Sequence, residues 1–263
     1  MNYNYYIEGV LRMATIIAFT NQKGGVAKTT STYNIGMALA QKGKKTLLID
    51  LDGQASLTIS VGKEPYKIDN TIASALKDPT SDIRNCIQNI KPNLDIITSR
   101  IELAKVEAEL INRTARESTL KRVLEPIQDS YDFILIDCPP QLSMLTINGL
   151  GCADYAIIPV KTDYLAYRGI DQLIETIDEV KRLINKNLKV MGVIATMYES
   201  RSTDDKDILE YLKKGYKVLG VIKKTVQAKK GIYDGESVVE RLPDSDIAVE
   251  YSKIADYIIG GVN

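Results

Sequence analysis

The sequence predicts an α/β fold, a mainly parallel twisted sheet with helices on both faces. Short apolar segments alternate along the chain with helical patterns, as in parallel sheets that are covered on both sides. A glycine-rich loop with two lysines, Lys23 and Lys28, directly follows the first apolar segment. Acidic residues follow two later apolar segments, and ligands of such folds bind where the strands end.

The first elements along the chain form a βαβ unit. An apolar strand is expected near residues 15–21, and a helical pattern over residues 28–42 ends at Gly43. A second strand over residues 46–49 leads directly into Asp50. This order of strand, glycine-rich loop, helix and strand with a terminal carboxylate is that of a P-loop nucleotide-binding fold.

Later segments extend the same alternation. An amphipathic helix is predicted from one apolar face, formed by Ile170, Leu173, Ile174, Ile177, Val180 and Ile184. Residues 62–92 lack strong periodicity, and we expect them to be looser. Further strands are predicted at residues 94–98, 133–136, 155–160, 190–195 and 218–222.

Size and composition favour one domain. A chain of 263 residues with 44% apolar content can bury a substantial core. Residues 1–12 are polar and tyrosine-rich and are expected to form a tail, whereas residues 13–263 are expected to form a single domain. Lys+Arg and Asp+Glu are both 34, so no global basic field attracts the protein to nucleic acid or membrane. A contact with a polyanion must therefore involve a local patch.

The cysteine and histidine counts restrict the chemistry. Cys86, Cys138 and Cys152 are odd in number and lack a C-x-x-C spacing, which argues against a disulfide framework and favours a reducing, cytoplasmic compartment. The chain has no histidine, so catalysis must use carboxylates, lysines and Mg²⁺. No apolar stretch is long enough to span a bilayer, and no signal-peptide pattern is present, so no membrane association is expected.

Residues 23–30, Lys-Gly-Gly-Val-Ala-Lys-Thr-Thr, predict a phosphate-binding loop. Backbone N–H groups and the positive end of the following helix converge there on one point. Lys28 supplies a point charge for the β and γ phosphates, and Thr29 supplies a hydroxyl for Mg²⁺. The alternative is a glycine-rich turn with surface lysines. The predicted ATP-binding residues of the loop are Lys23, Gly24, Gly25, Val26, Ala27, Lys28, Thr29 and Thr30.

The loop departs from the strict pattern G-x-x-x-x-G-K-[ST], because Gln22 and Ala27 replace its two glycines. Instead it carries a second lysine, Lys23, five residues before Lys28. In this it resembles the ParA/MinD family of P-loop ATPases, whose deviant Walker A motif reads K-G-G-x-[GA]-K-[ST]-T. The resemblance implies ATP and Mg²⁺ as cofactors and a homodimer in the ATP state. It also implies that Lys23 reaches across the dimer to the partner's nucleotide.

Two segments supply carboxylates. Asp50 and Asp52 end the second strand, and strand alternation would point both to one side, although such a pair can also simply begin a turn. The resemblance implies that Asp50 lies near the water shell of Mg²⁺ and that Asp52 positions the attacking water. Asp137 follows four apolar residues, as in a Walker B strand, and can hold Mg²⁺ through water.

The segment after Asp137 continues with Cys138, Pro139 and Pro140. In the family this segment senses the γ-phosphate, and Gln141 and Ser143 here depart from its more usual Ser and Gly. No arginine finger can be identified, so we expect slow intrinsic ATP hydrolysis that needs a stimulating partner.

Two further segments, 164–169 and 196–201, look like those of chromosome and plasmid partition ATPases. The resemblance covers residues 14 to about 260, without the extra N-terminal DNA-binding domain of larger plasmid members. It implies a role in DNA segregation, a ParB-like centromere-binding partner and association with the nucleoid. Site-specific operator binding is not expected. Met197 is the residue whose position suggests contact with adenine.

A lysine-rich segment supports the same interpretation. Residues 211–233 contain seven lysines and no acid, and lysine–phosphate contacts are sequence-blind and salt-sensitive. The family places DNA contacts near this region, where its common Ile-Pro-Arg-Asn-Val-Arg is replaced here by residues 222–227, Ile-Lys-Lys-Thr-Val-Gln. An ordinary solvated face is the alternative. The predicted residues for non-specific DNA binding are Lys223, Lys224, Lys229 and Lys230.

Two other functions remain open. A MinD-like membrane ATPase needs a basic amphipathic C-terminal helix, but Glu250, Lys253 and Asp256 give this one an acidic balance. We expect its apolar stripe, Ile247, Tyr251, Ile254 and Ile258, to pack on the domain instead. A metabolic enzyme of the same fold, such as a dethiobiotin synthetase or an iron–sulfur carrier ATPase, is the second alternative. No residue names a substrate, and a paired cysteine motif is missing.

Overall fold

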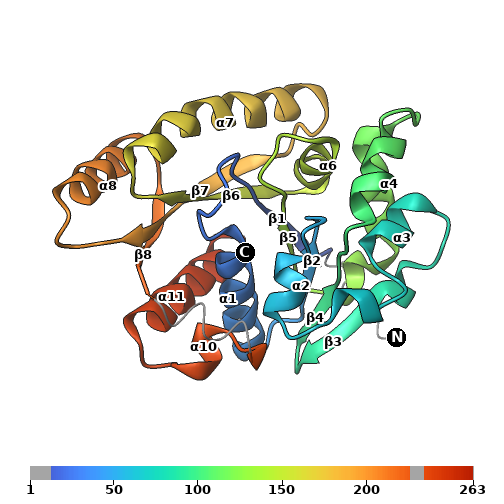
Figure 1. Ribbon diagram of the computed structural model, residues 1–263, viewed down its shortest axis with the longest axis horizontal. Helices are drawn as coiled ribbons and strands as arrows, with labels where there is room; N and C mark the ends of the chain where they lie inside the picture. The colour runs from blue at the N-terminus through green and yellow to red at the C-terminus, as the bar shows by residue number, and fades with distance from the viewer. Residues whose placement is uncertain (1–12, 226–233, 263) are drawn as a thin grey trace, which may run out of the picture.

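The computed structural model describes residues 13–225 and 234–262, apart from the side chains of residues 164–168. Within these residues the chain forms an eight-stranded sheet in the order β3-β4-β2-β5-β1-β6-β7-β8 (Figure 1). The strands are β1 (Thr15–Phe19), β2 (Thr46–Asp50), β3 (Ile87–Lys91), β4 (Leu94–Ile97), β5 (Phe133–Asp137), β6 (Tyr155–Lys161), β7 (Lys189–Tyr198) and β8 (Val218–Lys223).

All neighbouring strands pair in parallel except β3 and β4, which are antiparallel at one edge. Strands β2 and β5 are buried along their whole length because both faces of the sheet are covered. In β1, Ile16 and Ala18 belong to the core on one face, and Ile17 and Phe19 belong to the core on the other.

Helices cover the two faces in two groups (Figure 1). One face is covered by α1 (Lys28–Gln41), α2 (Ser56–Ser60), α10 (Val238–Arg241) and α11 (Asp246–Gly261). The other is covered by α3 (Ile72–Lys77), α4 (Leu103–Leu110), α5 (Thr119–Leu124), α6 (Met144–Cys152), α7 (Tyr164–Leu183) and α8 (Thr203–Gly215). None of the helices in the described residues combines the length and hydropathy that crossing a bilayer requires.

The predicted fold class is confirmed, with the predicted strands and the first helix in place. The C-terminal stripe packs as expected, because Tyr251, Ile254 and Ile258 are fully buried in α11, which lies against α1. In the predicted apolar face of α7, Ile170, Leu173, Ile177 and Val180 are buried and Ile174 is half-buried, but Ile184 lies beyond the helix and is 38% exposed.

The expectation that residues 62–92 are loose is wrong. The segment contains helix α3, two 3₁₀ turns (Pro65–Lys67 and Ile83–Cys86) and the edge strand β3. Ile72, Leu76 and Ile83 are buried in the core. Each element is only three to six residues long, so none is long enough to show a periodic pattern.

The parallel register gathers the ends of the central strands. Asp137 at the end of β5 stands beside Phe19 of β1 and beside Asp50 of β2. The glycine-rich loop begins immediately after β1. The carboxylates and the loop therefore meet at one edge of the sheet.

Candidate functional site

The loop between β1 and α1 is a strained turn that ends in a helix. Gly25 has a φ of 71°, and Ala27 has a φ of 62° as the residue that caps α1. A Cβ atom added to Gly24 or Gly25 would meet nothing within 4 Å. The open space above these two glycines lets a ligand approach the backbone closely.

Asn21, which the sequence analysis did not single out, holds the loop in shape. Its Nδ2 donates to the carbonyl of Pro159 at 2.7 Å, and its Oδ1 accepts from the backbone N–H of Lys23 at 2.9 Å. The Nζ of Lys28 donates to the carbonyls of Asn21 at 3.1 Å and Lys23 at 3.3 Å. Burial lowers the pKa of Lys28, and the carboxylate of Asp137 acts in the opposite direction.

Lys23 lies at the edge of the loop and pairs within its own chain. Its Nζ is 2.8 Å from Oδ1 of Asp163, just after β6, while Lys161 approaches the other oxygen of that carboxylate at 3.0 Å. The side chains of Lys23 and Asp163 are 35% and 30% exposed, so a second molecule can reach both. The partner subunit's nucleotide, which the resemblance assigns to Lys23, would compete with Asp163 for this ammonium group.

Asp137 and Thr29 form the buried acidic end of the site. Asp137 is 1% exposed, and its Oδ2 accepts a hydrogen bond from the hydroxyl of Thr29 at 2.6 Å. Its Oδ1 has no hydrogen-bond partner among the described residues. Burial, and then the nearby Asp50, raise the pKa of Asp137 to about 8. A buried carboxylate oxygen with no partner beside a threonine hydroxyl is a donor set that suits Mg²⁺.

No cluster of three or more His, Cys, Asp or Glu side chains suited to a metal occurs in the described part of the chain. This agrees with the small number of protein ligands that Mg²⁺ uses beside phosphates and water. The residues that fit the ion are Thr29 and Asp137, with Asp50 next to Asp137 in the sheet register.

Asp50 has its two oxygens engaged in fixing the segment after β2. Oδ2 accepts from the backbone N–H and the hydroxyl of Thr58 at 2.8 and 2.7 Å, and Oδ1 accepts from the N–H of Asp52 at 3.2 Å. The same Thr58 hydroxyl oxygen accepts from the N–H of Ser99 at 2.9 Å. Burial raises the pKa of Asp50 to about 6.

Strand alternation predicted that Asp50 and Asp52 point to the same side, but the two side chains lie in different environments. Strand β2 ends at Asp50, so the alternation does not extend to Asp52. Asp50 is fully buried, whereas Asp52 lines the cavity in front of the loop. Asp50 therefore positions the segment that presents Asp52.

A cavity of about 620 Å³ opens in front of the loop, a volume within the range of small-molecule sites. Its lining includes Gly24, Gly25 and Ala27 to Thr30 of the loop, and Asp52, Cys138 and Pro140 from the segments after β2 and β5; Val26 is buried. The remaining wall is formed by Ser56, Ser60, Met197, Ile222, Lys223, Lys224, Thr225, Ile247 and Tyr251.

Met197 reaches the cavity from a distorted end of β7. Its φ is 56°, and the pairing of β7 with β8 shifts register between Ala195 and Tyr198. Thr196 ties this end of the strand to the loop, because its hydroxyl donates to the carbonyl of Val26 at 3.0 Å. A left-handed conformation at a residue with a side chain is uncommon and is often found at functional sites. Contact between Met197 and adenine stays a prediction.

The predicted DNA-binding lysines lie in two places. Lys223 and Lys224 are on the cavity wall, and each is held by a carboxylate: Lys223 by Asp246 and Lys224 by Glu199, both at 2.6 Å. Lys229 and Lys230 lie outside the described residues. Contact of these four lysines with DNA stays a prediction.

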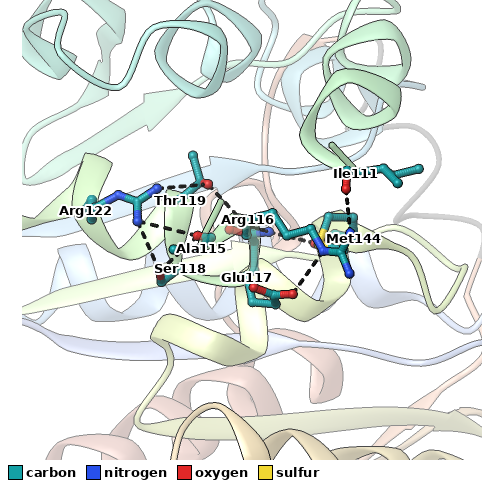
Figure 2. A network of polar contacts seen from close by, with 9 residues as sticks. Ile111, Ala115, Arg116, Glu117, Ser118, Thr119, Arg122 and Met144 are labelled. Atoms are coloured by element: carbon teal, nitrogen blue, oxygen red, sulfur yellow. Dashed lines mark hydrogen bonds and ion pairs between the residues drawn. The ribbon is translucent and has the colours of Figure 1, made fainter. Parts of the chain in front are cut away.

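Helix α6, which follows the Cys138–Pro139–Pro140 segment, is braced by polar contacts. Nδ2 of the buried Asn148 donates to the carbonyls of Arg116 and Met144, both at 2.9 Å, and its Oδ1 accepts from the N–H of Leu120 at 3.0 Å. Figure 2 shows Arg116 in turn bound to Glu117 and to the carbonyl of Ile111. These contacts fix the start of α6 relative to the turn that precedes α5.

Three residues that shape the site were missed by the sequence analysis: Asn21, Thr58 and Asp163. Each is a polar residue at or near the end of a strand or in a short helix, outside a recognised motif. Thr196 belongs to the segment 196–201 that was singled out, but no role was assigned to it. Their position beyond apolar segments was the available signal, but this signal is shared by many loop residues.

Comparison with known proteins finds a matching family profile and relatives of similar sequence. A family profile described as an AAA domain matches residues 14–190. The chain is 37% identical over 246 residues to the sporulation initiation inhibitor protein Soj of Bacillus subtilis, covering 92% of this chain and 97% of Soj. It is 37% identical over 212 residues to the chromosome partitioning protein ParA of Myxococcus xanthus, covering 79% and 73%.

Solved structures agree. A cobyrinic acid a,c-diamide synthase from Mycobacterium smegmatis, with ADP and magnesium bound, superposes with a TM-score of 0.82 at 34% identity and covers 94% of each chain. A protein from Borrelia burgdorferi described as a plasmid partition protein, with AMPPNP bound, gives a TM-score of 0.80 at 29% identity, covering 94% of this chain and 99% of its own.

Proposed function

The chain belongs to the AAA-domain family of P-loop ATPases that includes Soj and ParA, and from this we propose that it is a DNA partition ATPase using ATP and Mg²⁺. The observation that carries the proposal is the assembled loop. Lys28 and Thr29 line the cavity, the buried Asp137 accepts a hydrogen bond from Thr29, and Lys23 begins the loop.

Each residue has a role in ATP hydrolysis. Lys28 and the loop N–H groups bind the β and γ phosphates, and Thr29 and Asp137 hold Mg²⁺. Bound Mg²⁺ would neutralise the negative charge that develops on the phosphates. Asp52 orients the attacking water, and Asp50 holds the segment that carries Asp52. The lack of an identified arginine finger supports a slow intrinsic rate that a ParB-like partner raises.

ATP-dependent dimerisation is part of the proposal. Lys23 is partly exposed and its only partner in the described residues is the surface carboxylate of Asp163. An exposed ion pair contributes roughly 0 to 1 kcal/mol, so the triphosphate of a second subunit can displace it. The dimer then binds DNA non-specifically at the nucleoid and is released when ATP is hydrolysed.

Asp52→Ala tests the hydrolytic role. We expect ATP binding to remain and ATP turnover to fall by at least tenfold, because one water-orienting group is lost. Size-exclusion chromatography with light scattering should then show a dimer that persists with ATP. Lys28→Ala is the control for loss of nucleotide binding. ATP turnover at the parental rate in Asp52→Ala would rule out the role assigned to Asp52.

Binding to random-sequence DNA tests the partition function. The protein is measured without nucleotide, with ADP, with ATP and with a non-hydrolysable ATP analogue, each at two salt concentrations. Binding that requires ATP and weakens with salt is expected. ATP binding without DNA binding in every nucleotide state would contradict the proposal.

A second candidate follows from the name of the Mycobacterium smegmatis protein. It is ATP-dependent amide formation on a small carboxylic acid, a member of the metabolic class of the same fold. Steady ATP turnover that depends on a carboxylic acid substrate and ammonia, and not on DNA or a protein partner, would favour this candidate.

A further inference from the structure

A second group of cations lies at the far end of α7, away from the loop. Lys181 and Arg182 are in the last turn of the helix, Lys186 is in the following loop and Lys189 begins β7. All four are exposed, and the segment 180–198 that contains them has no acidic residue. We call these four residues the α7-end patch.

The cations of this patch make few short ion pairs, although the carboxylate of Asp154 lies near Lys189. Within the described residues, Lys181, Lys186 and Lys189 make no ion pair, and Arg182 approaches the exposed Glu179 at only 3.9 Å. Lys223 and Lys224, by contrast, are each held by a carboxylate at 2.6 Å. A phosphate can therefore approach Lys181, Lys186 and Lys189 without first breaking a short ion pair.

Stabilisation by the helix dipole explains why two of the four cations stand at these positions, but it does not explain the other two. Lys181 and Arg182 lie in the last turn, where cations are stabilised by the negative end of a helix. Lys186 and Lys189 lie beyond the helix and gain nothing from that effect, which falls off within one turn. They border a hollow of about 480 Å³ with Asp154, whose Oδ2 is occupied by the N–H of Ile16 at 2.9 Å.

The patch and the nucleotide cavity lie at opposite ends of the same elements. β6 runs from Tyr155, beside the hollow, to Lys161, beside Asp163. α7 then returns over 20 residues, a length of about 30 Å, to Leu183 (Figure 1). A ligand in the cavity therefore does not touch the patch.

We propose that the α7-end patch contacts the phosphates of DNA. The proposal rests on the proposed partition function and adds a second DNA-contacting surface to the lysine-rich segment 211–233. Free lysine and arginine side chains on phosphates give sequence-independent, salt-sensitive binding. Each patch is remote from the nucleotide, so ATP acts on DNA binding by joining two chains. Once one patch of the dimer is bound, the patch of the second chain binds the same DNA at a high effective concentration.

The test neutralises the patch in the full-length protein. Lys181, Arg182, Lys186 and Lys189 are all changed to Gln, and a control changes four exposed lysines elsewhere, Lys67, Lys77, Lys105 and Lys206, to Gln. Both variants lose four positive charges. With a non-hydrolysable ATP analogue present, affinity for random-sequence DNA is measured against salt concentration by fluorescence anisotropy, and nucleotide binding is measured in parallel.

The patch variant should bind DNA on the order of 100-fold more weakly at physiological salt than the parental protein. The slope of log affinity against log salt should be shallower by about 3.6 for each patch in contact. Nucleotide binding should be unchanged, and the control variant should bind DNA much more tightly than the patch variant.

Three results would overturn the proposal. If the parental protein binds DNA and the patch variant binds equally well, the surface is wrong and the partition function stands. If the two variants lose affinity equally, net charge and not this surface is responsible. If the parental protein binds no DNA in any nucleotide state, the partition function fails as well. Patch-dependent binding to anionic phospholipid vesicles in that case would assign the exposed Leu183 and Val190, 72% and 37% exposed, to a membrane contact.

Discussion

Ala27 occupies a backbone conformation that favours glycine. Its φ is 62°, and the strict P-loop pattern has glycine at this position. A left-handed conformation costs an L-residue roughly 1 to 2 kcal/mol, which exceeds the roughly 0.4 to 1 kcal/mol of added unfolded-state entropy that glycine brings. Ala27→Gly should therefore raise the free energy of unfolding by about 0.5 to 1 kcal/mol, as measured by urea denaturation.

Ala38→Gly provides the matched control, because Ala38 is buried within the regular part of α1. That change should lower stability by about 1 kcal/mol. A loss of stability in both variants would show that the loop is not strained at Ala27.

Asp137 makes the ligand-free protein sensitive to pH. Its pKa is raised from 3.8 to about 8, so the folded protein keeps a proton that the unfolded chain releases at much lower pH. The stability that this proton provides is complete below about pH 4 and is lost as the pH rises to about 8. The melting temperature without nucleotide should therefore fall across this range.

Asp137→Asn should remove most of this decrease and melt several degrees above the parental protein at pH 8, because it abolishes the cost of ionising a buried carboxyl. In Asp137→Asn, the melting temperature should still fall slightly as the pH rises to about 6, because the pKa of Asp50 is raised to about 6. Asp129→Asn, at an exposed position, serves as the control. A parallel pH profile in Asp137→Asn would mean that Asp137 is already ionised in the folded protein.

At the level of elements, α6 depends on Asn148. The side chain is fully buried and makes three hydrogen bonds to backbone groups of three different residues. Asn148→Ala removes the acceptor of the Leu120 N–H and one of the donors to Arg116 and Met144, and it should lower the free energy of unfolding by about 1 to 3 kcal/mol. Urea denaturation measures the change, and Asn187→Ala, at an exposed site, should stay within about 0.5 kcal/mol of the parental protein.

The sequence allowed prediction of elements that are buried on both faces. β1, β2 and β5 are continuous apolar runs and were recognised as strands. β3 was missed because it lies at an edge, is partly exposed and carries Gln88 and Asn89 between its isoleucines. Its pairing with β4 is a tertiary contact that the local residues do not specify.

For the site, too, features that adjacent residues specify could be predicted, and features that depend on tertiary contacts could not. The phosphate loop was recognisable because its residues are adjacent in sequence and share one backbone geometry. The contacts of Asp163 and Thr196 with the loop were not recognisable, since each residue approaches the loop across more than 130 residues of chain. The position of Lys223 and Lys224 on the cavity wall likewise depends on how β8 packs beside β7. Charge and the family resemblance suggested DNA for them, and only the fold brings them to the nucleotide cavity.

For the whole molecule, Mg²⁺ and ATP should act together on stability. A ligand at 100 times its Kd adds about 2.7 kcal/mol to the folded state. ATP with Mg²⁺ should therefore raise the melting temperature more than ATP with EDTA. Mg²⁺ without nucleotide should have little effect, because the described residues offer it no cluster of three acidic ligands. Equal melting temperatures with Mg²⁺ and with EDTA in the presence of ATP would contradict the assignment of Thr29 and Asp137.

Helix α1 begins at the phosphate loop and is enclosed by the rest of the molecule. Ten consecutive residues, Ser31 to Ala40, are buried, and α11, α2, α10 and β2 pack against the helix. Amide hydrogens in such an element exchange with solvent through global unfolding, whereas those of an outer helix such as α8 exchange through local opening. Deuterium should consequently label α8 long before α1. Any motion of the phosphate loop would then take place while α1, to which the loop is joined, stays folded.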